Sequence, residues 1–97
     1  MLEINVRLRG IGGLKINEEI KIRANKELYI KDLLQKIIEE KHELSDFIDK
    51  NTLKPKPGII LLVENIDYNI VSNINIRELL GKNTEINITI IPVNHGG

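Results

Sequence analysis

Two stretches of strictly alternating apolar and polar residues restrict the fold of this chain more than any other feature. One stretch runs from Leu2 to Arg9 and the other from Glu85 to Ile90, near the opposite end of the chain. A strand with this period turns one face to a core and the other to solvent. We therefore predict two strands of one sheet, each buried on a single face. With 97 residues in total, both strands should belong to one small domain.

Between the two stretches, residues 30–40 follow the period of a helix. Isoleucine and leucine recur there every three or four positions, with charged and polar residues on the other side. A hairpin, a helix and then further strands predict an α+β fold of the β-grasp type. Its mixed sheet would have four to five strands, with one main helix packed on one face. A right-handed crossover would place a later strand parallel to the first.

The remaining elements are shorter, and their boundaries are predicted from turn residues and apolar runs. They are a glycine turn at 10–13, a second strand over 14–22 with an irregularity at 17–19, a short helix at 44–51, a connector at 54–58, an apolar strand at 59–63, a turn at 64–67, a returning strand at 68–71, and a helical turn at 77–80 closed by Gly81. Residues 1–92 would form the domain and residues 93–97 a flexible tail.

The alternation and the helical period also predict which residues form the core between sheet and helix. These are Ile4, Val6, Leu8, Leu33, Ile37, Leu61, Val63, Ile88 and Ile90. The opposite face of the last strand and of its apolar neighbour would then show Ile60, Leu62, Thr89 and Ile91. We expect these four residues to form a partner interface, with Leu62 and Ile91 as its anchors. The alternative is that the connector 44–57 covers Ile60 or Leu62.

Composition excludes several classes of protein. The 14 basic and 14 acidic residues cancel, so no long-range field attracts nucleic acid or an anionic membrane. The chain has no cysteine, which excludes disulfides, thiolate metal sites and a cysteine nucleophile. The longest wholly apolar run, Ile59 to Val63, has five residues, so we expect neither a signal peptide nor a membrane span. A cytoplasmic location is the corresponding expectation.

The sequence contains no arrangement typical of a catalytic or metal site. His42 and His95 stand apart from any ligand-spaced partner, and His42 should be solvated at a helix end. The run Gly10-Ile11-Gly12-Gly13 joins two strands with no helix after it, which favours a turn over a phosphate loop. The carboxylates are scattered over predicted solvated faces. We expect no catalytic residues, no metal and no bound cofactor, and a protein that is acted upon by an enzyme.

The residues after the last strand, Asn94-His95-Gly96-Gly97, suggest how such an enzyme would act. Glycines leave nothing to obstruct a narrow channel, so the Gly97 carboxylate could be threaded to ATP in another protein's site. From Val93 to Gly97 the chain reaches at most about 17 Å, far enough while the globular body docks outside. The alternative is a frayed tail of a plain interaction module.

Two segments resemble the ubiquitin-related modifier family. Pro57-Gly58 followed by the apolar strand, the polar turn and Asp67-Tyr68 is similar to a segment of that family, and His95-Gly96-Gly97 is similar to its ending. The terminal Gly-Gly is also shared by the small archaeal modifiers, the thiamine sulfur carrier and the small subunit of molybdopterin synthase. Element order agrees over most of the chain.

The resemblance implies a protein substrate of an ATP-dependent activating enzyme. Gly97, with the slim Gly96 behind it, would be adenylated and then converted to a thiocarboxylate with sulfur from a donor. The sulfur would pass to a tRNA thiolase for 2-thiouridine formation, or the terminus would form isopeptide bonds with lysines of target proteins. Pro92-Val93 is closer to the ending of the molybdopterin synthase small subunit, which leaves that acceptor pathway as the alternative.

Overall fold

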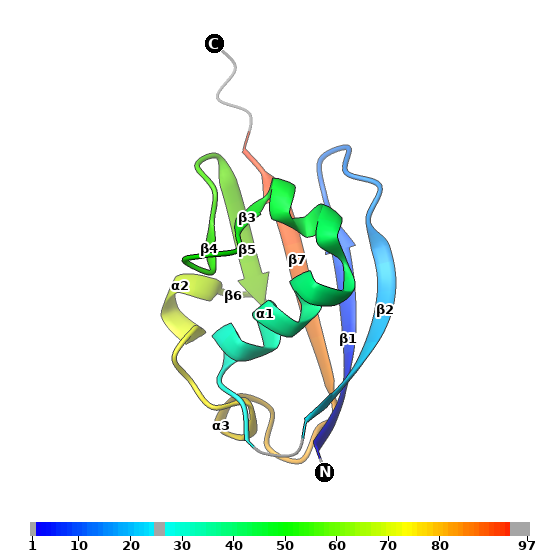
Figure 1. The fold of residues 1–97 in the computed structure, drawn as a ribbon, viewed down its shortest axis with the longest axis vertical. Helices are drawn as coiled ribbons and strands as arrows, with labels where there is room; N and C mark the ends of the chain where they lie inside the picture. The colour runs from blue at the N-terminus through cyan, green and yellow to red at the C-terminus, as the bar shows by residue number, and fades with distance from the viewer. Residues whose placement is uncertain (1, 25–26, 94–97) are drawn as a thin grey trace.

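The computed structural model describes residues 2–24 and 27–93 and shows a five-stranded mixed sheet with one long helix across it (Figure 1). Its elements, in chain order, are β1 (Leu2–Gly10), β2 (Asn17–Ala24), α1 (Ile30–Glu40), the 3₁₀ helix η1 (His42–Asp46), β3 (Ile48–Asp49), β4 (Lys54–Pro55), β5 (Ile59–Val63), β6 (Ile66–Asp67), α2 (Tyr68–Val71), α3 (Ile76–Leu80) and β7 (Glu85–Pro92). No helix in these two described ranges has both the length and the apolar character needed to cross a membrane.

The strands of the sheet lie in the order β2-β1-β7-β5-β6. The first and last long strands, β1 and β7, are parallel neighbours at its centre, with Val6 opposite Ile86. The other pairs, β1 with β2, β7 with β5 and β5 with β6, are antiparallel. This confirms the predicted α+β class and the parallel pairing of the first strand with a later one.

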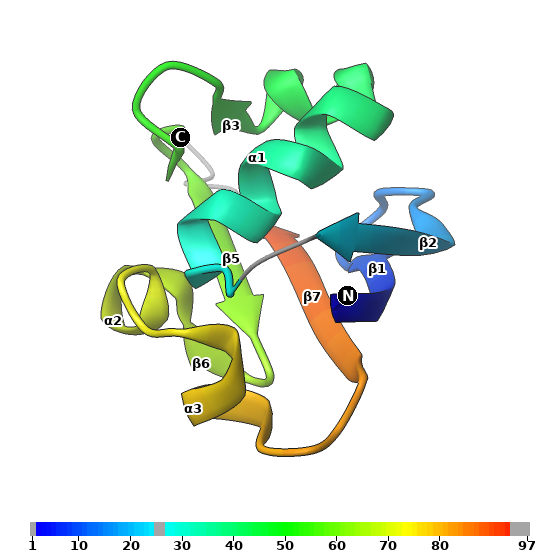
Figure 2. The same cartoon turned by 60° about the horizontal axis from the view of Figure 1, so that its bottom comes forward.

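The core lies between the inner face of the sheet and α1 (Figure 2). All nine residues predicted to be buried are buried, among them Val6, Leu33 and Ile37. The helix begins at Ile30, where the Asp32 carboxylate accepts the backbone N–H of Tyr29 at 3.1 Å. This contact pairs one of the donors that a helix N-terminus leaves free. The sheet therefore has one face covered by a helix and one outer face.

The segment after β5 differs from the prediction. The turn predicted at 64–67 contains β6, and the strand predicted at 68–71 is the helix α2. The Asp67 carboxylate accepts the N–H of Asn69 at 2.8 Å and caps this helix. Tyr68 and Val71, three residues apart, are its buried side chains. The helical turn predicted at 77–80 is present as α3, ending at Gly81.

The helix predicted at 44–51 is also wrong. A shorter 3₁₀ helix, η1, begins before this segment and covers only its first residues. Strands β3 and β4 then form a separate two-stranded sheet. The cause is local: the Asp49 carboxylate accepts the N–H groups of Asn51 and Thr52, at 2.8 and 3.2 Å, and closes a turn. These bonds lower the pKa of Asp49 below its usual value.

Strand β2 is regular from its first residue, so the irregularity predicted at 17–19 is absent. Its pairing with β1 runs unbroken from Asn17 to Ala24. Residues 14 and 16, predicted as strand, lie in the loop before it. The Glu18 carboxylate of β2 bonds the Lys41 ammonium at the end of α1, at 2.8 Å, and raises the pKa of Lys41. This ion pair ties the helix end to the edge of the sheet.

Candidate functional site

The site predicted from the sequence has two parts, a tail and a docking face. The tail residues Asn94, His95, Gly96 and Gly97 lie outside the described residues. The structure does describe the point from which they continue, at Val93. We call Pro92 and Val93 the tail root.

Backbone contacts hold the tail root on the side of β5. The N–H of Val93 donates to the carbonyl of Gly58 at 2.7 Å, and Pro92 lies opposite Ile59 in the β5–β7 ladder. Gly58 has a positive φ of 83°, and a β-carbon there would lie 3.8 Å from the Val93 carbonyl oxygen. That distance is an ordinary van der Waals contact, so it is the positive φ of the turn before β5 that favours glycine at this position.

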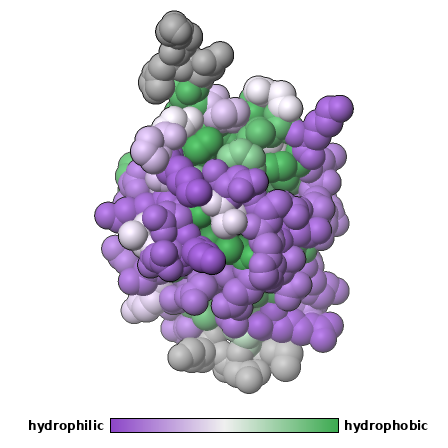
Figure 3. All heavy atoms as spheres, turned by 45° about the horizontal axis from the view of Figure 1, so that its top comes forward, coloured by the Kyte–Doolittle hydropathy of each residue, from purple (hydrophilic) through white to green (hydrophobic). Residues whose placement is uncertain are grey.

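The loop between β1 and β2 contacts the tail root from the other side. Its Ile11 N–H donates to the carbonyl of Ile90 at 3.0 Å. Gly12 adopts a φ of 74°, and a β-carbon on it would lie 3.6 Å from Cγ of Pro92. This loop, the turn before β5 and the end of β7 all lie at the upper end of the molecule in Figure 1. Viewed toward this end, hydrophobic residues gather near the tail root within a largely hydrophilic surface (Figure 3).

The four residues predicted as a partner interface lie together on the outer face of the sheet. Ile60 is directly opposite Ile91, and Leu62 is opposite Thr89. We call these four residues the apolar patch. Ile60 is 39% exposed and the other three are half-buried. The three apolar members are outside the core cluster, whereas the connector between α1 and β5 packs against that core through Phe47 and Leu53.

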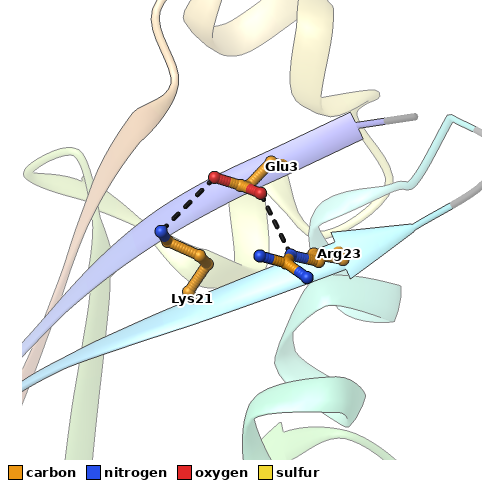
Figure 4. Close-up of polar contacts among 3 residues, drawn as sticks. All are labelled: Glu3, Lys21 and Arg23. Atoms are coloured by element: carbon orange, nitrogen blue, oxygen red, sulfur yellow. Dashed lines mark hydrogen bonds and ion pairs between the residues drawn. The ribbon is translucent and has the colours of Figure 1, made fainter.

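The other half of the outer face, on β1 and β2, has charged side chains in pairs. Glu3 contacts Lys21 at 3.5 Å and Arg23 at 3.0 Å (Figure 4). Arg7 contacts Glu19 at 3.3 Å. We call this the charged half. These side chains are 44% to 73% exposed, so water screens the pairs and each adds little to stability.

A polar contact closes the lower border of the apolar patch. Asn87 of β7 donates from its backbone N–H and from its side-chain amide to the Glu64 carboxylate, at 2.8 and 3.0 Å. Glu64 and Asn65 have positive φ values of 52° and 64°, which form the tight turn between β5 and β6. The patch is thus open toward the tail root and bounded by hydrogen-bonded polar groups at its other end.

Outside these two regions the described residues offer little for catalysis. No group of three or more His, Cys, Asp and Glu side chains in ranges 2–24 and 27–93 is arranged to hold a metal. His42 is exposed, as predicted, and lines a hollow of about 280 Å³ between α1 and the β3–β4 turn. Burial raises the pKa of Tyr68 to about 12, with a smaller contribution from Asp32, so its phenol stays protonated.

Sequence reasoning missed the β1–β2 loop as part of this region. Gly10 to Gly13 were interpreted only as turn residues, whereas the structure places Ile11 and Gly12 beside β7 and Pro92. Ile11 is also 51% exposed. The alternation of Leu2 to Arg9, extended by two residues, would have placed Ile11 on the outer face.

Solved structures resemble this chain in fold. The crystal structure of SAMP1 from Haloferax volcanii aligns with a TM-score of 0.60 and 9% identity, over 96% of this chain and 99% of that one. The solution structure of the Haloferax volcanii HVO 2177 protein aligns with a TM-score of 0.54 and 16% identity, over 98% of this chain and 88% of that one. No curated protein gives a significant match. The model of the family described as Urm1, ubiquitin related modifier, matches residues 5–97, and the chain therefore belongs to the ubiquitin-related modifier family.

Proposed function

We propose that this protein is a sulfur carrier and protein modifier whose reacting group is the carboxylate of Gly97. The observation that supports this most is the family match, which includes the final residues His95-Gly96-Gly97. The family consists of ubiquitin-like modifiers and sulfur carriers, which are generally not catalysts. In this proposal the protein is the substrate of a cytoplasmic activating enzyme that uses ATP.

The proposed chemistry has two steps. The Gly97 carboxylate attacks the α-phosphate of ATP, forming an acyl adenylate and releasing pyrophosphate. A hydrosulfide equivalent from a sulfur donor then attacks the acyl carbon and releases AMP and a proton, leaving a thiocarboxylate. If a lysine amine of a target protein attacks instead, AMP leaves and an isopeptide bond forms. The thiocarboxylate would supply sulfur for 2-thiouridine in tRNA.

The contacts of the tail root support this division of labour. The backbone of Val93 is hydrogen-bonded to Gly58, and Pro92 packs beside Gly12. These contacts attach the chain to the globular body as far as Val93. The four residues beyond can extend at most about 14 Å. An enzyme that binds the body close to Val93 could therefore receive Gly97 in its own active site.

The apolar patch is the proposed docking face for the activating enzyme. It lies on β5 and β7, and β7 leads directly into the tail root. Apolar side chains that lie outside the core of a small domain favour contact with a partner. Docking here would place the bound enzyme beside the start of the tail.

The test is the intact mass of the full chain after incubation with ATP, an E1-like adenylating enzyme from the same organism and hydrosulfide. Wild-type protein should gain the mass of one sulfur in place of one oxygen. Deletion of Gly97, or Gly96→Phe, should abolish the gain while the free energy of unfolding changes by less than about 0.5 kcal/mol. His42→Ala, an exposed change on the other side of the core, is the control. Activation of the deletion variant would refute the mechanism, and an unreactive wild type would favour a plain interaction module.

The acceptor is tested with the thiocarboxylated protein. Incubation with a tRNA thiolase, ATP and tRNA should yield 2-thiouridine, measured by nucleoside mass spectrometry. Incubation with the large subunit of molybdopterin synthase and its precursor is the parallel arm. Sulfur transfer in the second arm alone would assign the protein to molybdenum cofactor synthesis, the pathway suggested by Pro92-Val93.

A further inference from the structure

Ile11 continues the parallel pairing of β1 and β7 beyond the end of the strand. Asn5 N–H donates to Thr84 O at 2.7 Å, and Ile11 N–H donates to Ile90 O at 3.0 Å, so the donor and the acceptor both advance by six residues. Ile11 is thus in register beside Ile91. Because Ile91 is opposite Ile60, three isoleucines, from the loop after β1, from β7 and from β5, form one row next to the tail root. We call them the isoleucine row.

Arg9 lies beside this row on the outer face. It is directly opposite Thr89 of β7, which is in turn opposite Leu62 of β5. Side chains alternate between the two faces along β1. Leu8 is buried on the inner face, so Arg9, like Arg7, is exposed on the outer face. A cationic side chain therefore stands at the border between the charged half and the apolar patch.

Arg9 differs from the other cations of the outer face in its partners. Lys21 and Arg23 pair with Glu3, and Arg7 pairs with Glu19. Arg9 forms no ion pair with any carboxylate in residues 2–24 and 27–93. It shares a shallow hollow of about 370 Å³ with Arg7, Asn17, Glu18 and Glu19.

Both acidic neighbours in that hollow have another cation as their partner. Glu18 is bonded to Lys41 at 2.8 Å, and Glu19 contacts Arg7 at 3.3 Å. The positive charge of Arg9 is therefore not matched within its own surroundings. A guanidinium binds a carboxylate through two parallel hydrogen bonds, which gives such a pair a defined orientation.

We propose that Arg9 is a specificity residue of the docking face, which receives a carboxylate of the activating enzyme while an apolar side chain of that enzyme covers the isoleucine row. This deepens the proposed function and rests on it. The unmatched charge argues for an acidic group on the partner. Its position opposite Thr89, on the strand that leads into the tail root, argues that this partner is the protein that holds the tail.

The proposal is tested by ATP–pyrophosphate exchange, with the full chain as the varied substrate of the E1-like adenylating enzyme from the same organism. Arg9→Glu should raise KM by about 10-fold at low salt with kcat unchanged, and the difference should shrink at high salt. Arg9→Lys should recover part of the loss. Ile11→Ala should raise KM by a similar factor that does not depend on salt. Arg23→Glu makes the same change in charge within the charged half and is the matched control.

Each outcome bears on the docking mode. Equal KM values for Arg9→Glu and Arg23→Glu would overturn the carboxylate contact, since only the overall charge would then matter. A defect of Arg9→Glu seen only in later sulfur transfer to tRNA would also overturn it and would assign Arg9 to a phosphate contact. Absence of exchange with wild-type protein would refute the proposed function itself, which distinguishes that failure from the others. Thermal unfolding of each variant shows whether its fold is retained.

Discussion

On the outer face of the sheet, the charged half on β1 and β2 and the apolar patch on β5 and β7 differ in what their side chains contact. In the charged half, Glu3 binds two cations across the hairpin, and Arg7 binds Glu19. In the apolar patch, Ile60 lies opposite Ile91 and Leu62 lies opposite Thr89, and all four side chains are uncharged. Apart from Arg9 at its border, the charged half pairs its charges internally, whereas the patch gains free energy only when a partner covers it.

This contrast indicates which exposed surface is the better candidate for recognition of a partner. Both halves belong to one sheet and both face away from α1. Only the patch adjoins the tail root, through β7 and Val93. A face that combines uncovered apolar side chains with proximity to the proposed reacting end is the better candidate for recognition.

The largest effect is expected beneath the outer face, where both halves share one core. Ile88→Ala should lower the free energy of unfolding by about 2–5 kcal/mol, because it leaves a cavity between β7 and α1. Thr89→Ala, on the outer side of the same strand, should lower it by less than about 1 kcal/mol. Urea denaturation of the two variants measures both values. A loss below about 1 kcal/mol for Ile88→Ala would show that the faces of β7 are wrongly assigned.

The next largest effect is expected on the outer face itself, where the two halves should respond differently to the same change in charge. Leu62→Asp with Ile91→Asp should leave the protein folded but lower the rate of activation by about 100-fold, equivalent to about 3 kcal/mol for central interface anchors. Lys21→Ser with Arg23→Ser changes the net charge equally within the charged half. It should change activation by less than about 2-fold. The measurement is ATP–pyrophosphate exchange at subsaturating protein.

Two results would contradict this difference between the halves. Equal activation by both double variants would remove the apolar patch from the mechanism. If circular dichroism shows that the Leu62→Asp, Ile91→Asp variant is unfolded, these side chains stabilise the fold. This is the result expected from the alternative in which the connector 44–57 covers the patch.

A smaller effect is expected for the ion pairs of the charged half. Glu3→Gln removes the contacts to Lys21 and Arg23 together and should lower the free energy of unfolding by less than about 1 kcal/mol. The difference should vanish in about 1 M salt, where the screening length is about 3 Å. Denaturation at low and high salt measures it. A larger loss that persists at high salt would mean that this half is structurally more than a solvated surface.

The smallest effect at neutral pH concerns the buried Tyr68. The raised pKa of Tyr68, about 12, means that the folded state keeps the phenol protonated after the unfolded state, near 10, has lost its proton. The contribution is therefore complete below pH 10 and is lost as the pH rises through 12. Tyr68→Phe should make unfolding less sensitive to pH in this window. Thermal unfolding at pH 9 and pH 11.5 checks this.

Long periodic segments were predicted correctly because each residue repeats the same information. Leu2 to Gly10, Ile30 to Glu40 and Glu85 to Pro92 were predicted as strand, helix and strand to within two residues. Two of the short segments, 44–51 and 68–71, were predicted wrongly, because a single hydrogen bond can decide the structure of so short a segment. The Asp67 carboxylate caps a helix, α2, where a strand was predicted. The Asp49 carboxylate closes a turn where a helix was predicted.

The candidate site shows the same division. The alternation of β7 was enough to place Thr89 and Ile91 on the outer face, and the resemblance pointed to Gly96 and Gly97. Ile11 was missed because its place depends on how β1 and β7, almost eighty residues apart, are aligned. The partners of Glu3 likewise follow from the register of β1 and β2.

The sequence by itself determined the faces of the long strands, the apolar stripe of α1 and the Gly-Gly ending, since each is written in the order of neighbouring residues. Only the folded chain as a whole brings Ile11, Ile60 and Ile91 into one row, and places Arg9 beside this row with no ion-pair partner in residues 2–24 and 27–93. The physical reason is that a period defines a face, but not which strand lies beside it. Neighbouring faces are combined by strand pairing, which depends on the packing of the whole core.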